Sequence, residues 1–491
     1  MSITRRAFLK VLGASPILGV AAGDYSFLHL LPGWPDPLID SGNTLPPSTT
    51  EIDDISHVLA RSSYGWRYKD YANVLRGSSS SEKAVEHYLE RQLNPEDIDD
   101  RILARTLRRF EVLNEPIGEL YEYKEGPLLQ TLIRGALLRA VYSSRQLYEV
   151  MVQFWTDHFN IDSSKGECKW LKVADDRDVI RRHAMDSFPA LLRASALSPA
   201  MLWYLDGRDN QKQIGADKPN ENYARELLEL HSLGVHGGYS QTDVMEVARC
   251  LTGWTVRERS QFFKGRVEFI SARHDDGPKI ILGNEIAPGG GAQDLDHVLE
   301  IVASHPATAQ HIATKLCRRF ISDTPPFSAC VKVAATFQNS GGDIKSTLRS
   351  LFTTSEFFAA KGAKFRRPFE FVVGALRASN AKTDGGKFVI DYLDRMGHAP
   401  FQYPTPDGYS ANAAPWLNTL LWRWNFSAAL ADNRIPGTVI DQRLLKANCG
   451  GDDGLMAAIL GRLATADEKK AYTQAPNGLA LLLASPAFQY S

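Results

Sequence analysis

Apolar side chains recur every three or four residues along most of the chain after residue 50, beginning with Ile52, Ile55, Val58 and Leu59. This spacing places them on one face of a helix, so it predicts amphipathic α-helices wherever it persists. Comparable segments lie at 82–93, 99–113, 128–160, 177–195, 221–233, 241–253, 294–303, 306–320, 328–339, 343–352, 367–379, 388–396, 413–430, 453–463 and 475–485. The segment 128–160 fits either one long helix or two. The pattern therefore predicts a mainly α protein with a large multi-helix globular fold.

Alternating strand pattern is scarce and is clearest around residues 266–282. Segment 266–270 and segment 279–282 are rich in Val, Ile and Leu, and His274-Asp275-Asp276-Gly277 lies between them. An Asp-Gly pair between two apolar runs is typical of a β-hairpin. We therefore expect one small β-hairpin in which 266–270 pairs with 279–282.

The first 22 residues have the order of features found in a twin-arginine signal peptide. Arg5 and Arg6 precede Phe-Leu-Lys, a short apolar run follows, and small residues end at Ala22. The apolar run is too short to span a bilayer stably. The pattern predicts export by the twin-arginine translocase to the periplasm or the exterior. The alternatives are a chance Arg-Arg pair in an ordinary helix and an uncleaved signal that acts as an anchor.

Three regions follow from this organisation. Residues 1–22 form the signal peptide, residues 23–50 a Pro/Ser/Thr-rich linker, and residues 51–491 a helical domain that can divide into two lobes. After the signal peptide, no stretch approaches the ~18 uninterrupted apolar residues of a membrane-spanning helix, so we expect no transmembrane span in the mature chain.

Charge and cysteine content exclude some classes of protein. The chain has 56 basic and 57 acidic residues, a net charge of -1, which is not the charge balance of a nucleic-acid-binding protein. Its five cysteines include no Cys-x-x-Cys pair, which argues against a zinc ribbon or a thioredoxin motif. Cys317 and Cys330 can form a disulfide in an oxidising periplasm, or all five can be buried thiols.

The segment 219–234 has the densest set of polar residues among apolar ones. Asn222, Arg225, Glu226 and Glu229 share a helix face at spacings of three and four. One interpretation is an ion-paired helix, with Glu221 to Arg225 and Arg225 to Glu229 four residues apart. The other interpretation is a carboxylate site that faces a cleft.

Two further segments can contribute to such a site. His158 follows Asp157 in an aromatic setting, where a lone histidine is most often a core residue, and His274-Asp275 lies in the predicted hairpin loop. We hypothesise that the helix carrying Glu226 meets His158 across a shared cleft and that the hairpin brings the loop near. The candidate catalytic residues are His158, Glu221, Arg225 and Glu226, and the candidate metal ligands are His158, Glu226, His274 and Asp275.

Two versions of this cleft remain open. In one, the carboxylates and His158 hold a divalent metal such as calcium, manganese or zinc, and Arg225 orients a carboxylate or an anionic substrate group. In the other, the same residues form a closed ion-pair network that touches no ligand. The sequence contains no His-Glu-x-x-His, Gly-x-Ser-x-Gly, Walker or dinucleotide-binding motif that would favour a particular enzyme class.

Taken in order, several motifs resemble the bacterial family catalogued as "domain of unknown function 1800" over residues 51–490. The matching elements are Phe154-Trp155-x-x-His158-Phe159, Asn220-Glu221-Asn222-x-Ala224-Arg225-Glu226-Leu227, Gly238-Tyr239-x-x-x-Asp243-Val244, Ala248-Arg249-x-Leu251-Thr252-Gly253-Trp254, His274-Asp275-x-Gly277-x-Lys279, His305-Pro306-Ala307-Thr308-Ala309, and Pro404-Thr405-Pro406-Asp407-Gly408-Tyr409 with Trp416. The resemblance implies an exported protein, often with a twin-arginine signal, that is encoded beside a sulfatase-like protein. It supplies no activity.

Two functions are therefore expected. The first is an exported helical binding or assembly protein that works with a sulfatase-like partner. The alternative is a metal-assisted hydrolase of the cell envelope or periplasm. Whether the chain is an enzyme stays open, because each motif also has a structural explanation.

Overall fold

A computed structural model describes residues 46–212 and 218–491. The predicted signal peptide lies outside these residues, as does most of the predicted linker. Within the described residues, no helix is both long and apolar enough to cross a membrane. The five cysteines are buried free thiols, and the thiols of Cys317 and Cys330 form a hydrogen bond with each other.

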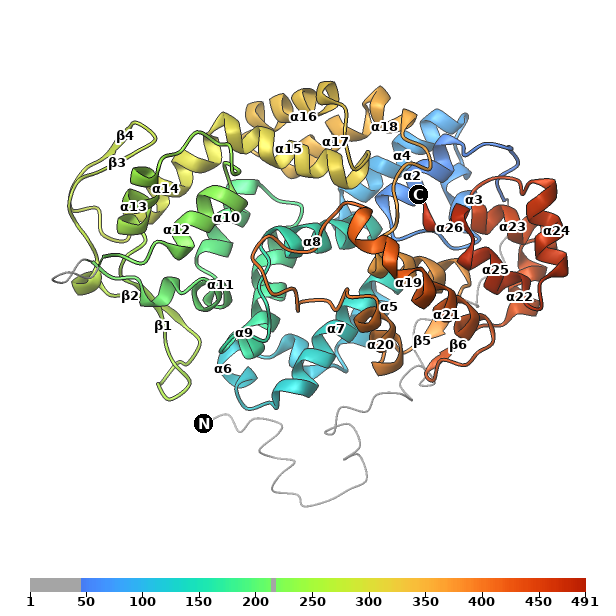
Figure 1. The fold of residues 1–491 in the computed structure, drawn as a ribbon, viewed down its shortest axis with the longest axis horizontal. Coiled ribbons are helices and arrows are strands. Elements are labelled where there is room, and N and C mark those ends of the chain that lie inside the picture. Colours follow the sequence, from blue (N-terminus) through green and yellow to red (C-terminus); the bar gives the residue numbers. More distant parts are fainter. Residues whose placement is uncertain (1–45, 213–217) are drawn as a thin grey trace, which may run out of the picture.

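Helices dominate the structure, which confirms the mainly α prediction (Figure 1). The first half contains α2 (Asp54–Ser62), α3 (Asp70–Leu75), α4 (Ser81–Leu93), α5 (Arg101–Leu107), α6 (Ile117–Leu120), α7 (Glu125–Tyr142), α8 (Gln146–His158), α9 (Cys168–Ala174), the π-helical segment η5 (Asp175–Arg181), α10 (Phe188–Ala196), α11 (Pro199–Tyr204), α12 (Asn222–Glu226), the π-helical segment η7 (Leu227–His231) and α13 (Gln241–Cys250).

The second half continues with the helices that complete the fold. They are α14 (Gln293–Ser304), α15 (Pro306–Phe320), α16 (Phe327–Asn339), α17 (Ile344–Phe352), α18 (Ser355–Ala359), α19 (Pro368–Ala378), α20 (Lys387–Arg395), α21 (Leu420–Ala431), α22 (Gln442–Asn448), α23 (Asp452–Leu460), α24 (Ala466–Gln474), α25 (Gly478–Ala484) and α26 (Pro486–Gln489).

The segment 128–160 forms two helices, α7 and α8, with a break at Ser143. The side-chain amide of Gln146 donates to the carbonyls of Ala140 and Ser143, at 3.0 and 2.8 Å. The last carbonyls of a helix have no partner within it, so this amide satisfies groups that would otherwise be buried without a hydrogen bond. Gln146, the first residue of α8, therefore also caps the carboxyl end of α7.

The predicted pairing of 266–270 with 279–282 is wrong. Strand β2 (Val267–Phe269) pairs antiparallel with β1 (Trp254–Val256), and β3 (Lys279–Ile281) pairs antiparallel with β4 (Asn284–Ile286). A two-residue turn joins β3 to β4, with Leu282 and Gly283 at φ of 50° and 78°. Tight hairpin turns need such left-handed residues, and a leucine gives no sequence warning of one. A third two-stranded sheet pairs β5 (Lys382–Thr383) with β6 (Thr438–Val439).

Helix α8 lies near the middle of the molecule (Figure 1). The β1–β4 hairpins lie at one end, and the carboxy-terminal helices α21–α26 lie at the other, beside the amino-terminal α2–α4. The main hydrophobic core contains residues from Ile55 to Phe488. A small second cluster contains Phe365, Tyr409 and Trp416, the last two from the segment that precedes α21. Two cavities lie against α8, and Asp157 lines both of them.

Candidate functional site

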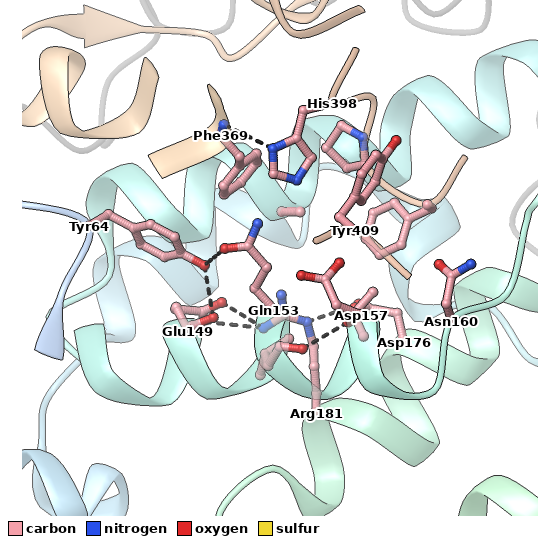
Figure 2. Close-up of a pocket in the computed structure, with 15 residues that line it drawn as sticks. Tyr64, Glu149, Gln153, Asp157, Asn160, Asp176, Arg181, Phe369, His398 and Tyr409 are labelled. Atoms are coloured by element: carbon pink, nitrogen blue, oxygen red, sulfur yellow. Dashed lines mark hydrogen bonds and ion pairs between the residues drawn. The ribbon is translucent and has the colours of Figure 1, made fainter. Parts of the chain in front are cut away.

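Helix α8 carries a polar row that faces a small interior space, which we call the inner cavity. Glu149, Gln153 and Asp157 follow one another at intervals of four, so they share one helix face. The inner cavity has a volume of about 40 Å³, enough for a water molecule and too small for a metabolite. Its labelled walls in Figure 2 are Tyr64, Glu149, Gln153, Asp157, Asn160, Asp176, Arg181, Phe369, His398 and Tyr409.

One arginine organises the floor of the inner cavity. Arg181 lies between Glu149 and Asp176 and binds each carboxylate at 2.9 Å (Figure 2). The hydroxyl of Tyr64 donates to Gln153 at 2.9 Å. The second oxygen of Asp176, Oδ1, is buried and has no hydrogen-bond partner among the described residues. Ion pairs and hydrogen bonds therefore satisfy most of the polar groups around the inner cavity, and the remaining space can hold water.

A larger cavity, the outer cavity, shares Asp157 and Tyr409 with the inner one. Its volume is about 300 Å³, at the lower end of the range for small-molecule sites. The end of α8, one face of α15, the start of α19 and the loop 403–412 supply its walls. The lining residues are Phe154, Asp157, His158, Leu230, His311, Lys315, Arg318, Arg319, Arg367, Tyr403, Asp407, Gly408, Tyr409, Ser410, Ala411 and Asn412.

Two histidines bind the end of η7 at the wall of the outer cavity. Nε2 of His158 lies 3.2 Å from the carbonyl oxygen of His231, and Nε2 of His311 lies 3.2 Å from that of Leu230. Each imidazole N–H therefore donates to a carbonyl that the end of the helix leaves unpaired. Nδ1 of His158 is then a lone-pair acceptor, and the ammonium of Lys315 donates to it at 2.8 Å.

The electrostatics of this histidine group favour neutral imidazoles. Burial, reinforced by Lys315, holds the pKa of His158 well below its ordinary value. The same causes lower the pKa of His231 to about 3 and that of His311 to about 4. His231 is fully buried, and neither of its ring nitrogens has a hydrogen-bond partner within the described residues.

Buried ion pairs fix the base of the outer cavity. Arg367 binds Asp157 at 2.6 Å and Glu370 at 2.9 Å, and Arg319 binds Glu370 at 3.3 Å. Although burial opposes ionisation, Arg319 and Arg367 hold the pKa of Glu370 far below its ordinary value. Burial outweighs Arg367 at Asp157, whose pKa is raised. Two arginines thus share one strongly ionised carboxylate, and Asp157 is held less firmly in its charged form.

The loop 403–412 covers the outer cavity, and a glycine allows its close approach to α8. A Cβ on Gly408 would lie 2.0 Å from the carbonyl oxygen of Asp157, and its φ is +72°. The amide of Asn160 donates to the carbonyls of Tyr403 and Thr405, at 2.9 and 2.8 Å. The motif that contains Pro404 to Tyr409 is therefore a wall of the cavity, bound to the carboxyl end of α8.

The structure separates most of the residues expected to share one cleft. Glu221 and Arg225 pair with each other at 2.8 Å, as the ion-paired interpretation predicted, and their side chains are 38% and 36% exposed. Burial and the charges of Glu229 and Asp407 raise the pKa of the Glu226 carboxyl, but Glu226 is not among the residues that line the outer cavity. From this helical region, the groups that meet His158 are the ring and carbonyl of His231.

His274 and Asp275 belong to another cluster, beside β3 and β4 and away from α8 (Figure 1). The ring of His274 contacts Asp294 at 3.2 Å, and Lys279 binds the same carboxylate at 2.5 Å. Asp275 instead pairs with Arg249 at 2.8 Å, which lowers the pKa of its carboxyl to about 2. These contacts tie the loop between β2 and β3 to helices α13 and α14, so the expected convergence with His158 does not occur.

The geometry does not support a divalent metal held by His158 and the carboxylates. Both ring nitrogens of His158 already have partners. Across residues 46–212 and 218–491, no group of three or more His, Cys, Asp and Glu side chains is placed to hold a metal ion. The proposed ligands His158, Glu226, His274 and Asp275 are divided among three places in the fold.

Several residues of the outer cavity had no place in the sequence hypothesis. His311, Lys315 and Arg319 recur at intervals of four on α15 and line the outer cavity. This row was visible in the sequence, but an ordinary solvent-exposed face has the same pattern. Arg367 precedes a proline at the start of a helix, and nothing local distinguishes it from a surface arginine.

The chain belongs to the family described as "Protein of unknown function (DUF1800)", whose family model matches residues 57–490. This match confirms the resemblance drawn from the motifs. No curated protein and no solved structure matches the chain. The family assigns no activity, so a function has to be argued from the cavities themselves.

Proposed function

We propose that this DUF1800 protein is an exported helical binding protein whose outer cavity takes a small anionic ligand. Export by the twin-arginine route to the periplasm or the exterior is part of this proposal and rests on the signal-like residues 1–22. A sulfatase-like exported partner is also part of the proposal, and it rests on the family resemblance. A protein of that kind would handle sulfate esters, and an anion-binding cavity suits the same class of compound.

The excess of positive charge in the outer cavity carries the proposal. Four cations line it, Lys315, Arg318, Arg319 and Arg367, against two lining carboxylates, Asp157 and Asp407, and the carboxylate of Glu370, which Arg319 and Arg367 both bind. Arg367 neutralises Asp157, and Asp407 accepts a hydrogen bond from a threonine hydroxyl in its own loop.

Two of these cations lack a carboxylate of their own in the described part of the chain. Lys315 donates to an imidazole, and Arg318 donates to the backbone carbonyl of Asp323 at 3.3 Å. Arg319 is 6% exposed and pairs with Glu370 at 3.3 Å, and its Nε has no hydrogen-bond partner among the described residues. A buried cation persists at low cost only when an anion or several acceptors surround it. An anionic ligand in the cavity would supply such an anion to Lys315 and Arg318.

Binding has more support than metal-assisted hydrolysis. The hydrolase alternative needs a metal centre, and the described residues contain no three-ligand group for one. The anion-binding proposal needs only the cations already in place.

Titration calorimetry with sodium sulfate and sodium phosphate in low-chloride buffer tests the proposal. We expect saturable 1:1 binding of at least one anion. Lys315→Gln and Arg318→Gln should each weaken it about 10- to 100-fold, the loss expected for one charged hydrogen bond. Lys332→Gln removes an exposed lysine of α16 and serves as the matched control. Absence of saturable binding, or equal losses in all three variants, would overturn the proposal.

A further inference from the structure

Lys315 combines exposure to a cavity with an unusual hydrogen-bond partner. It lines the outer cavity, is only partly buried, and directs its ammonium to Nδ1 of His158. Because Nε2 of His158 is committed to the carbonyl of His231, the imidazole can only accept from the lysine. The nearby carboxylate of Asp157 is held by Arg367 instead. No carboxylate therefore locks Lys315 in its charged form within the described structure.

A comparison with Lys364 shows what this environment changes. Burial lowers the pKa of both lysines to about 8. Lys364, however, is closed in by an ion pair with Asp323 and a 2.6 Å hydrogen bond to the carbonyl of Ala411. Lys315 alone of the two lines a cavity large enough for a small molecule. Its amine can lose a proton near neutral pH and meet a ligand, which is the setting of imine-forming lysines.

We propose that Lys315 forms an imine with a small anionic aldehyde or ketone, whose negative group the arginines of the outer cavity bind. This inference rests on the proposed anion-binding function and names the ligand class. In the reaction, the neutral Nζ attacks the carbonyl carbon and the carbonyl electron pair moves to oxygen. The resulting carbinolamine loses that oxygen as water when the carbon–nitrogen double bond forms. Amine and carbonyl thus give imine and water, with no oxidant or reductant required.

The surrounding residues can bind both the iminium nitrogen and the anionic group of the ligand. When the imine nitrogen takes a proton from water it becomes an iminium with one N–H, and Nδ1 of His158 can accept that N–H as it now accepts the ammonium. Arg318, which lines the same cavity, offers donors to a neighbouring carboxylate or sulfonate. His158 acts here as a positioning residue, because it is neutral and its other nitrogen is fixed.

Reductive trapping on the full chain tests the inference. The protein is incubated with glyoxylate and cyanoborohydride, and tryptic peptides are mapped by mass spectrometry. Lys315 should be carboxymethylated at least about tenfold faster than the exposed Lys332, because a lowered pKa leaves more of the amine neutral. Sulfate should slow the labelling in proportion to its occupancy. Lys364 should stay unlabelled, and Lys315→Arg should abolish the fast product.

The outcomes separate this inference from the proposed function. If Lys315 reacts no faster than Lys332 while sulfate still binds to the wild-type protein, the imine is wrong and anion binding stands. If sulfate does not bind and Lys315 is not labelled, both fail. Acetaldehyde lacks the negative group and should label Lys315 more slowly than glyoxylate relative to Lys332. Equal selectivity for the two aldehydes would overturn the anionic ligand class.

Discussion

Replacing Arg367 by methionine tests the ion pairs between the two cavities directly. Arg367 is 3% exposed and binds Asp157 and Glu370, at 2.6 and 2.9 Å. Methionine keeps an apolar stem of similar length and removes the guanidinium. Glu370 then retains Arg319 at 3.3 Å, whereas Asp157 is left buried without its partner.

The expected cost follows from that unpaired carboxylate. Removing one partner of a buried ion pair destabilises a protein by about 3–5 kcal/mol. With an unfolding entropy of about 2.1 cal/mol/K per residue over roughly 440 residues, this lowers the melting temperature by about 3–5 °C.

The effect should depend on pH. The pKa of Asp157 in the folded state is already raised, so its protonated form is favoured by folding. That contribution is present at low pH and is lost as the pH rises through the raised value. Without Arg367 the pKa rises further, so the deficit of the variant should be smaller near pH 5 than near pH 8.

Scanning calorimetry at both pH values measures the effect. Arg193→Met is the matched control, because its ion pair with Asp296 is exposed on both sides, at 54% and 47%. Exposed pairs contribute about 0–1 kcal/mol, so this control should melt within about 1 °C of wild type. Asp157→Asn combined with Arg367→Met should recover part of the loss. If Arg367→Met melts like the control at both pH values, the proposed energetic role of the pair is refuted.

Two further predictions concern the loop and export. Gly408→Ala should weaken sulfate binding at least about tenfold, because its Cβ would collide with a backbone oxygen and displace the cavity wall; Gly397→Ala is the control, since it has a similar φ of +70° and open space around its Cβ, and an equal effect in calorimetry would contradict the explanation. Changing Arg5 and Arg6 together to lysine should leave the precursor in the cytoplasm on fractionation and immunoblotting, and mature protein in the periplasm of that mutant would defeat the export hypothesis.

The helices were predictable because their signals are local and repeated. Helix α15 was expected at 306–320 and lies at Pro306–Phe320, with a proline in its first turn and apolar residues on one face. The strand pairing was not predictable, because Leu282 adopts a left-handed conformation that leucine rarely takes. The periodicity rule for helices therefore held along α15, whereas the turn rule for hairpins failed at Leu282.

The candidate site was only partly predictable because its contacts are long-range. His158 was identified from its aromatic setting, but its lysine partner lies 157 residues away along the chain. The pair between Asp157 and Arg367 spans 210 residues. A charged residue on a helix has the same local pattern whether it faces solvent or another helix. Which charged side chains line the site depends on which helices pack together, and the pattern within a single segment does not predict that packing.

The two π-helical segments explain the remaining difference. Predicted faces assumed 3.6 residues per turn, and this placed Arg225, Glu226 and Glu229 together. The α-helix ends at Glu226, and η7 winds more widely from Leu227 to His231. The Glu221–Arg225 pair lies before that change and formed as predicted. After it, the helix presents the carbonyls of its last residues, and the ring of His231, to the histidines of α8 and α15.

The other π-helical segment, η5, supplies polar groups to the inner cavity as η7 does to the wall of the outer cavity. It contains Asp176 and Arg181, five residues apart, and their direct contact at 2.9 Å fits the wider i to i+5 turn. Both departures from regular helix geometry thus occur where buried polar groups meet around α8. A wider turn leaves backbone and side-chain groups facing a neighbour at a spacing that an α-helix does not provide. The helical irregularities that defeat prediction from periodicity are therefore also what assembles the polar centre of this fold.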